Sequence, residues 1–434
     1  MFHNGKELTA DDVKTCLEVQ SKIISVSSTV MGTYSANFPI KMVEKLSKYS
    51  VKVYLKSATP FIQDLATWMT SMIWPAEEVV QNTTFNNPTG TGPYKIKEFI
   101  SGVSVTLERV PHYWGENMTG YWVGPAYMQT IIFKYIPEET TRMAELETGA
   151  SDITTIAQIS NINILKDEGF QTIVKTGGSY QNLAFNCRNW PMNDTRFRRA
   201  LYMAVDWEKI VPLVCPGYER LTDVLELTPY SNPAAAAFLP TYDLEAAKSL
   251  VEQVAADAGK TLPITITLYD AITPGSMAEY LPDVLISLWA KIGVQLNVRM
   301  IDPGSVRAVR SGNIKPPGEY WDIFCLYGEF RLVFNPRFCW IPFNNASGLA
   351  KDGMNYMGYN NAEMNNLTAQ SLQTVDTAAL KTIYQKIQRI WYEELPMIPV
   401  FSGRAQWAIN PKVHGFNEAW DRSTCSLTNV WKET

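Results

Sequence analysis

The sequence predicts an α/β protein with more than one lobe. Its 434 residues are too many for one compact core and enough for two or three lobes. A Gly/Pro loop and two alternating strands, "GTGPYKIKEFISGVSVTLERV", predict an antiparallel hairpin in the first part of the chain. Further along, the strand "LPITITLYD", a helix and the strand "VQLNVRM" follow in the order that predicts parallel pairing with a right-handed crossover.

The chain opens with a helix signal. In "FHNGKELTADDV", Thr9 has the place of an N-cap and Asp12 that of the acidic partner in a capping box. The alternation in "KYSVKVYLK" predicts a half-buried strand over 48–56, and residues 60–75 have the pattern of an apolar helical segment.

The elements that follow are short. The hairpin after residue 92 turns at Ser101–Gly102, and residues 127–135 predict another strand. A short helix is predicted over 140–148, and Gly149 is a suitable C-terminal cap for it.

The second half of the chain carries the strongest helix signals. A helix is predicted over 277–291, and "YWDIFCLY" at 320–327 has the apolar composition of a buried parallel strand. The apolar stripe over 378–395 predicts a long helix, which Pro396 and Pro399 end before a final extended stretch.

Composition narrows the class of protein. Hydrophobic residues make up 46% and charged residues 19%, as in ordinary globular proteins, and the net charge of −5 argues against a nucleic-acid binder. No segment reaches the length of a transmembrane helix. Thirteen Trp and 21 Tyr are a high content, which suits either loop packing or the lining of a concave site.

Neither a metal nor another cofactor is indicated. The three histidines, His3, His112 and His414, lie far apart and form no HExxH motif. The cysteines form no CxxC pair, which argues against a zinc knuckle; their even number permits disulfides, and buried free thiols are an equal alternative. They are Cys16, Cys187, Cys215, Cys325, Cys339 and Cys425.

Motifs for catalysis are absent from the sequence. The "GTG" at 90–92 is followed by Pro93 and a strand, so it lacks the helix N-terminus of a phosphate-binding loop. There is no GxSxG or SxxK motif, and we predict that the protein is not an enzyme. Glu329, in an apolar and aromatic run, leaves one alternative open, an acid hydrolase with a second carboxylate about 5–10 Å away.

Several blocks of the sequence carry a resemblance to one family. They are "FHNGKELTADDV", "GTGPYKIKEFISGVSVTLERVPHYWG", "IPEETTRMAELETGASDI", "LAFNCRNWPMNDTRFRRALYMAVDWEKIV", "AKIGVQLNV", "YNNAEMNNL" and "ELPMIPVF". In this order they resemble the bacterial extracellular solute-binding proteins of the oligopeptide, dipeptide and nickel transporters, family 5.

The resemblance implies an α/β, two-lobed periplasmic-binding-protein-like fold of type II, similar to large cluster C. Lobe one would hold residues 1–181 and 402–434, with 1–92 as an extra subdomain, and lobe two residues 182–401. Hinge strands would lie near 180–186 and 399–404. Because the family's "TADDV" helix lies some tens of residues into the mature protein, we expect this chain to lack the export signal and the first strands of lobe one.

The implied function is that of the substrate-binding component of an ABC importer. Such a protein captures a peptide or similar small solute between its lobes, without turnover, and presents it to a membrane permease. We expect a monomeric lipoprotein in the periplasm or at the outer face of the cytoplasmic membrane, with no cofactor and no nucleic-acid partner. Two alternatives on the same fold stay open, a ligand-sensing domain of a regulator or receptor and an oligosaccharide-binding member.

Candidate ligand contacts come from the strand ends. In open α/β sheets, ligands lie beyond the carboxyl ends of the strands, here the strands ending near Leu268 and Leu326. The first implied hinge strand also faces the ligand. The predicted contacts are Tyr180, Asn182, Asn186, Tyr269, Tyr327, Glu329 and Arg331.

Four side chains have specific expected roles. Glu329 stands where similar peptide-binding members carry the Asp that holds a peptide amino terminus, although its longer side chain weakens the peptide assignment. Arg331 would hold a ligand carboxylate through two hydrogen bonds, unless it pairs with Glu329. Trp340 and Trp114 would stack on the ligand, with a turn-anchor role as the alternative for Trp114.

Some charged residues are expected to be structural. Asp194 has the position of a helix N-cap, and Arg196–Arg199 are expected to form salt bridges.

Overall fold

The computed structural model describes residues 1–27, 40–56, 58, 72–81, 88–120, 123–225, 228–270, 280–301, 321–328, 355, 357–418 and 425–433. The chain divides into two compact units, unit 1 with Met1–Val174 and Ala405–Thr434, and unit 2 with Lys175–Arg404. Strands β7 (Gln171–Phe185) and β12 (Met397–Ile409) each run through one boundary. The predicted lobe boundaries, after residues 181 and 401, lie seven and three residues away from the unit boundaries. The extra subdomain over 1–92 stays a prediction.

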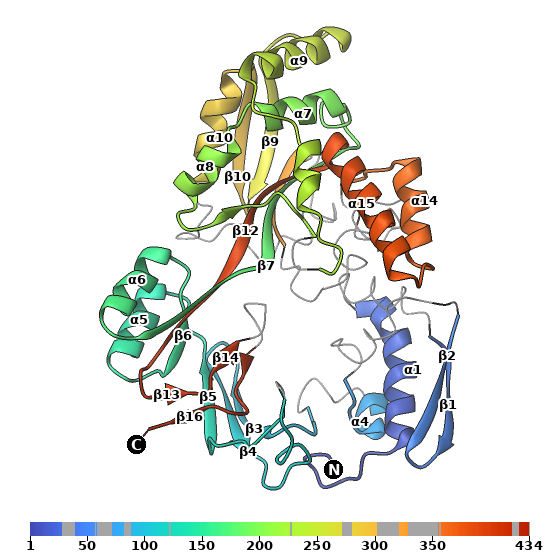
Figure 1. Cartoon of the computed structure of the whole chain (residues 1–434), viewed down its shortest axis with the longest axis vertical. Coiled ribbons are helices and arrows are strands. Elements are labelled where there is room, and N and C mark those ends of the chain that lie inside the picture. Colours follow the sequence, from blue (N-terminus) through green and yellow to red (C-terminus); the bar gives the residue numbers. More distant parts are fainter. Residues whose placement is uncertain are drawn as a thin grey trace. The chain divides into compact units, whose positions relative to one another are not determined.

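The N-terminal part of unit 1 is a helix packed on a hairpin (Figure 1). Its elements are α1 (Ala10–Ser27), β1 (Ile40–Ser47), β2 (Ser50–Leu55) and α4 (Ala76–Gln81). β1 and β2 pair antiparallel, so the predicted strand at 48–56 is confirmed. Most of the helical segment predicted at 60–75 lies outside the described residues.

A buried carboxylate joins the starts of the two helices. The side chain of Asp12 accepts hydrogen bonds from the backbone N–H and the hydroxyl of Thr9 at 2.9 and 3.0 Å. It also accepts from the ammonium of Lys6 at 2.7 Å and from the N–H of Ala76, the first residue of α4, at 2.9 Å. The predicted helix entry is therefore confirmed, and Asp12 also fixes α4.

A three-stranded antiparallel sheet follows in unit 1. Its strands are β3 (Tyr94–Ile100), β4 (Ser104–Arg109) and β5 (Thr130–Lys134). The predicted turn between β3 and β4 is confirmed, and Gly102 there has a φ of +72°, which a residue without a Cβ adopts at little cost.

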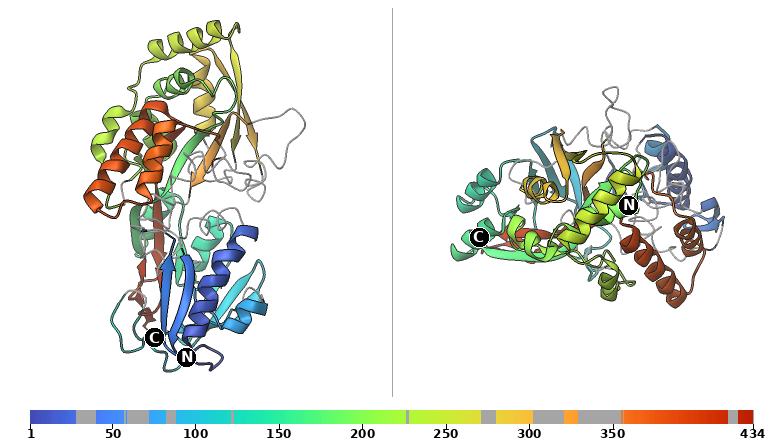
Figure 2. Two further views of the ribbon diagram at one scale, coloured as in Figure 1. Left: turned by 90° about the vertical axis from the view of Figure 1, so that its right-hand side faces the viewer. Right: turned by 90° about the horizontal axis from the view of Figure 1, so that it is seen from above.

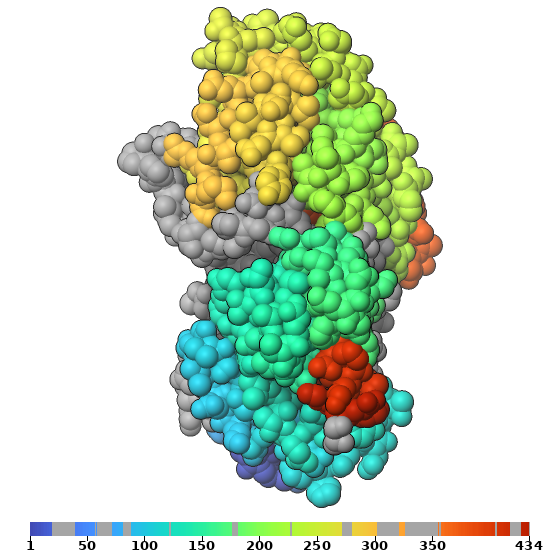
Figure 3. Space-filling model, turned by 90° about the vertical axis from the view of Figure 1, so that its left-hand side faces the viewer, coloured from blue at the N-terminus to red at the C-terminus, as the bar shows by residue number. Residues whose placement is uncertain are grey.

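The rest of unit 1 combines two helices with the C-terminus. α5 (Glu139–Glu147), β6 (Ile153–Thr155) and α6 (Ile159–Asp167) enclose a small core made of Leu146, Ile156, Ile162, Leu165 and Ala408. The C-terminal strands are β13 (Val413–His414), β14 (Asn417–Glu418), β15 (Cys425–Ser426) and β16 (Trp431–Lys432). Figure 3 shows these C-terminal residues in red as one patch on the surface of unit 1.

Unit 2 is built on a mixed sheet with strand order β10–β9–β11–β7–β12. β9 (Ile264–Asp270) is parallel to β10 (Val294–Met300) and to β11 (Ile323–Gly328), whereas β7 is antiparallel to β11. α10 (Leu281–Ala290) connects β9 to β10. The predicted strand–helix–strand unit and the buried strand at 320–327 are therefore confirmed.

Helices lie around this sheet (Figures 1 and 2). Besides α10 they are α7 (Thr195–Met203), α8 (Trp207–Val214), α9 (Leu244–Asp257), α14 (Ala362–Ser371), α15 (Thr377–Glu394) and the 3-10 helix η2 (Pro233–Phe238). The two-residue strand β8 (Glu219–Arg220) pairs with β12.

The charged residues at and after the start of α7 form different kinds of hydrogen bond. The side chain of Asp194 accepts the N–H of Arg196 at 2.8 Å, which confirms the predicted N-cap, and Arg196 also bridges to Asp257. The prediction of salt bridges is wrong for Arg198 and Arg199, which form none with the residues that the structure describes. Both guanidinium groups donate instead to backbone carbonyls near the end of α15, because the last carbonyls of a helix have no partner within it.

The Arg198 side chain caps the C-terminus of α15. This helix buries its predicted apolar stripe and ends at Leu395, whose φ is +45°. The buried guanidinium donates to the carbonyls of Glu394 and Leu395, both at 3.0 Å, and to that of Met192 at 2.7 Å. One side chain thus joins α7 to the start of β12.

Arg198→Ala should lower the free energy of unfolding by roughly 3 kcal/mol, because it leaves several buried carbonyls without donors. Arg196→Ala, two residues away on the same helix, removes only partly exposed ion pairs and should cost less than about 1 kcal/mol. Urea unfolding of both variants measures the difference, and equal losses would contradict the capping role of Arg198.

A carboxylate also organises the amino end of β11. The Asp322 side chain accepts the N–H of Thr267 at 2.8 Å, and the Asp322 carbonyl accepts the N–H of Asn186 at 2.9 Å. Asp322 therefore connects β9 with β7. Burial raises the pKa of the Asp322 carboxyl to about 6, and the hydrogen bond from Thr267 only partly opposes this rise.

Because the pKa of Asp322 is higher in the folded chain than in the unfolded chain, its contribution to stability is largest in acid and declines as the pH rises. Relative to Asp322→Asn, the wild type should lose up to about 3 kcal/mol of unfolding free energy between about pH 4 and pH 7. Thermal unfolding of both proteins across this range provides the test. Parallel pH profiles would show that the carboxyl does not titrate there.

Candidate functional site

Three strands of unit 2 end at the same side of the sheet. Because β9, β10 and β11 are parallel, their last residues, Asp270, Met300 and Gly328, lie along one edge, here called the carboxyl edge. Ligands of open α/β sheets bind beyond such an edge. Antiparallel pairing brings residues 180–182 of β7 to the same edge, since Tyr180 pairs with Gly328 and Asn182 with Leu326.

Strand register places two predicted residues on one face of the sheet. Asn182 pairs with Leu326 of β11, and Phe324, two residues before Leu326, pairs with Tyr269 of β9. Paired residues, and residues two apart on a strand, point to the same side. Asn182 and Tyr269 therefore share a face, near the carboxyl edge.

Asn182 has an unsatisfied acceptor. Only 2% of its surface is exposed, and among the described residues its side-chain carbonyl oxygen, Oδ1, has no hydrogen-bond partner. Buried polar atoms in folded proteins are almost always paired, so this oxygen is suited to a donor that binds from outside the chain.

Tyr269 brings an aromatic ring and a cation to the same face. Its ring is buried, and the guanidinium of Arg299, the paired residue on β10, lies 5.9 Å from the ring centroid. Arg299 was not among the predicted residues. The parallel pairing of β9 and β10 could have indicated it, because Arg299 is the register partner of Tyr269.

The other face of the sheet carries a buried polar row. Gln181 of β7 donates from Nε2 to Sγ of Cys325 on β11, at 2.5 Å, and both side chains are buried. Burial, with the charge of Asp270 on β9 as the next cause, raises the pKa of the Cys325 thiol far above its usual range. The thiol stays protonated and is not a reactive nucleophile.

The other described cysteines are also thiols. Cys16, Cys187 and Cys215 are thiols that form no disulfide bond, and burial raises the pKa of each of them. The predicted alternative of buried free thiols is thus confirmed for Cys16, Cys215 and Cys325, which are buried. Cys339 and the side chain of Cys425 lie outside the described part of the chain.

Two of the predicted contacts donate hydrogen bonds to backbone carbonyls of their own unit. Asn186 is at the opposite end of β7, where its Nδ2 donates to the carbonyl of Trp321 at 3.0 Å. Trp114 belongs to unit 1, is 60% exposed and donates from Nε1 to the carbonyl of Thr91 at 2.9 Å. These bonds give Asn186 a structural task and agree with the turn-anchor alternative for Trp114.

The remaining predicted contacts are only partly described. Tyr180 and Tyr327 have their backbones at the carboxyl edge, but their side chains lie outside the described part. Glu329, Arg331 and Trp340 lie outside it entirely, so their roles, and the hydrolase alternative that depends on Glu329, stay predictions.

No metal site forms among the described residues. No group of three or more His, Cys, Asp or Glu side chains in this part of the chain could hold an ion. His3 bonds to the carbonyl of Gly92 at 2.9 Å, and His414 bonds to Glu433 at 2.7 Å. Over the same residues, no helix is long and apolar enough to cross a membrane.

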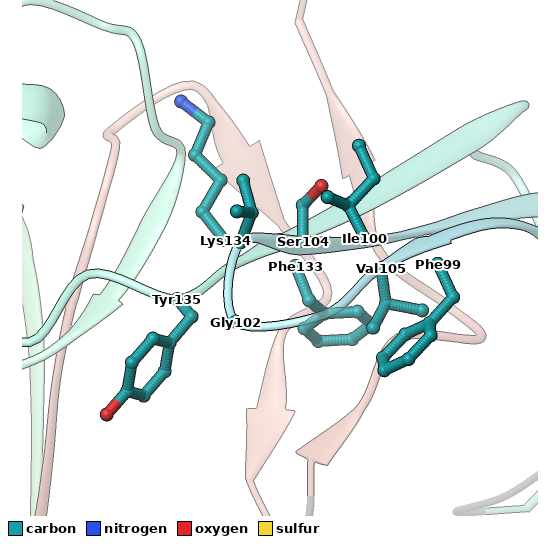
Figure 4. Close-up of a pocket in the computed structure, with 9 residues that line it drawn as sticks. Phe99, Ile100, Gly102, Ser104, Val105, Phe133, Lys134 and Tyr135 are labelled. Atoms are coloured by element: carbon teal, nitrogen blue, oxygen red, sulfur yellow. The ribbon is translucent and has the colours of Figure 1, made fainter.

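Unit 1 contains a separate apolar hollow of about 380 Å³ on its three-stranded sheet. Phe99, Val105 and Phe133 form a row across the three strands and point to one side of it (Figure 4). The ammonium of Lys134, which also lines the hollow, bonds to Glu145 at 2.9 Å. The hollow therefore has few polar groups to orient a solute, unlike the carboxyl edge of unit 2.

Comparisons with known proteins agree with this geometry. The family model for "Bacterial extracellular solute-binding proteins, family 5 Middle" matches residues 1–321. The oligopeptide-binding protein AppA of Bacillus subtilis is 24% identical, over 99% of this chain and 78% of its own length. Heme-binding protein A of Haemophilus influenzae is 25% identical, over 96% of this chain and 76% of its own length.

The fold is also similar to solved structures. The ABC transporter substrate-binding protein CtaP of Listeria monocytogenes has a TM-score of 0.80 and 22% identity, with 100% of this chain and 86% of CtaP covered. The predicted two-lobed periplasmic-binding-protein-like fold is therefore confirmed. With the family model matching well over half of its residues, the chain belongs to the bacterial extracellular solute-binding proteins of family 5.

Proposed function

We propose that this chain is the monomeric substrate-binding component of an ABC importer and that it captures a peptide or similar small solute at the carboxyl edge of unit 2. It then presents the solute, unchanged, to a membrane permease at the outer face of the cytoplasmic membrane or in the periplasm. Membership of a solute-binding family supports this role, as does the fold that the chain shares with a substrate-binding protein of an ABC transporter.

The observation that carries the ligand assignment is the unpaired Oδ1 of Asn182 on the same face of the sheet as Tyr269. A peptide supplies N–H donors for such an acceptor and apolar side chains for an aromatic wall. The name of AppA, an oligopeptide-binding protein, supports the same class. Sugar hydroxyls could also donate to Asn182, so the experiment has to separate peptides from oligosaccharides.

Binding without chemistry is the favoured mode of action. The thiol at the carboxyl edge, that of Cys325, is buried with a raised pKa, and the family is one of solute-binding proteins. Affinity would come from apolar walls and a few polar anchors, of which Asn182 is one.

The test is thermal unfolding of the purified chain with panels of short peptides and of oligosaccharides. A ligand at about 100 times its Kd should stabilise the folded state by about 2.7 kcal/mol and raise Tm by several degrees. We expect the rise with peptides. A rise only with oligosaccharides would contradict the peptide assignment while leaving the solute-binding role intact.

Two substitutions of the same kind separate the site from the scaffold. Asn182→Leu should raise the Kd for the ligand about tenfold or more, because it removes a buried acceptor. It should leave the Tm of the free protein unchanged or higher. Asn186→Leu removes the hydrogen bond to Trp321, so it should lower the Tm of the free protein and leave the Kd unchanged. Titration calorimetry measures the Kd of both variants and thermal unfolding measures their Tm. An unchanged Kd in Asn182→Leu would remove Asn182 from the site.

A further inference from the structure

The β1–β2 hairpin of unit 1 concentrates positive charge in an acidic protein. The whole chain has a net charge of −5, with 38 Lys and Arg among 434 residues. The 17 residues from 40 to 56 contain a single acidic residue, Glu44, and five lysines. These are Lys41, Lys45, Lys48, Lys52 and Lys56.

Part of this charge is neutralised within unit 1. Lys45 pairs with Asp11 and Lys48 with Glu7, each at 2.6 Å. Lys41, Lys52 and Lys56 are exposed, and among the described residues none of them forms an ion pair.

Glu44 is the acidic residue nearest to Lys52 in the strand register, but the two side chains form no ion pair. It lies opposite Lys52 in the strand register, but its carboxylate accepts the hydroxyl of Tyr54 at 2.6 Å. The ammonium of Lys52 lies over the Tyr54 ring instead, 4.8 Å from its centroid.

The hairpin also exposes large apolar side chains. Helix α1 covers one side of it and buries Val43 completely (Figures 1 and 2). Met42, Leu46 and Tyr49 remain 46%, 57% and 67% exposed. Lysines around isolated apolar and tyrosine side chains are typical of segments that lie in the headgroup region of a bilayer.

We propose that the β1–β2 hairpin docks on the anionic phospholipid surface of a membrane. The lysines would attract the headgroups, while Met42, Leu46 and Tyr49 would enter the boundary between headgroups and acyl chains. A lipid surface is favoured over an acidic protein because the hairpin has no arginine and its charges are spread along two strands. Protein interfaces are instead enriched in Arg and depleted of Lys.

The experiment is co-sedimentation of the full chain with vesicles of phosphatidylglycerol and phosphatidylcholine in equal parts. The triple variant Lys41→Gln, Lys52→Gln, Lys56→Gln should partition more weakly by about fivefold for each lysine removed. Raising the salt concentration from about 0.05 M to about 0.5 M should weaken wild-type binding, because screening shortens the range of the attraction. Met42→Ser with Leu46→Ser should reduce the binding that persists at high salt.

A matched variant controls for overall charge. Lys248→Gln, Lys381→Gln, Lys386→Gln changes the net charge equally, at exposed lysines of α9 and α15, and should bind the vesicles like the wild type. Circular dichroism should be unchanged in both triple variants, since all six side chains are exposed. Three results would each overturn the proposal. The two triple variants could lose binding equally, or the wild type could bind pure phosphatidylcholine vesicles as well as it binds the anionic ones. The wild type could also bind no vesicles, which would point to an acidic protein as the partner.

Discussion

The candidate site depends on the pairing register between β7 and β11. Side chains alternate across a sheet, so a shift of one residue would exchange the two faces of a strand. In the observed register, Asn182 faces the side of Tyr269, and Gln181 faces the side of Cys325. Asp322 helps to hold this register at the opposite end of β11, because it bonds to Thr267 of β9 and to Asn186, the residue that follows β7.

Two arginines, Arg198 and Arg220, hold the chain where β12 begins. Arg220 donates to the carbonyls of Leu221, Pro399 and Val400 and to the hydroxyl of Tyr202. The rings of Tyr202 and Trp207 lie within 6 Å of its guanidinium, at 5.7 and 5.6 Å. With Arg198 at Leu395, two cations thus satisfy carbonyls along one short stretch, and this part of unit 2 is stabilised by hydrogen bonds to backbone rather than by ion pairs.

Unit 1 and unit 2 contribute different properties to a solute-binding protein. Unit 2 combines an unsatisfied acceptor, an aromatic ring and a guanidinium at the carboxyl edge, where we propose that the solute binds. Unit 1 carries the basic hairpin, which we propose as a membrane-docking surface. One family fold serves ligands as different as oligopeptides and haem, so the ligand is decided by a few side chains rather than by the scaffold.

Local sequence patterns were sufficient to predict most elements of the fold. Alternation in "ITITLYD" and "VQLNVRM", with a helix between them, predicted two parallel strands, and these place Tyr269 at the carboxyl edge. The capping residues Asp194 and Gly149 were also predictable, because each acts on its own helix end within a few residues.

Contacts between distant segments could not be predicted in this way. Nothing local distinguishes Asn182 from Asn186, yet pairing with β11 places one near the carboxyl edge and the other beside Trp321. Arg198 was expected to find a carboxylate and binds the carbonyls of Glu394 and Leu395, which are 196 and 197 residues away. The sequence by itself determined the periodicity of the strands and helices, whereas tertiary structure decided each side chain's partner, because long-range pairing brings these groups together.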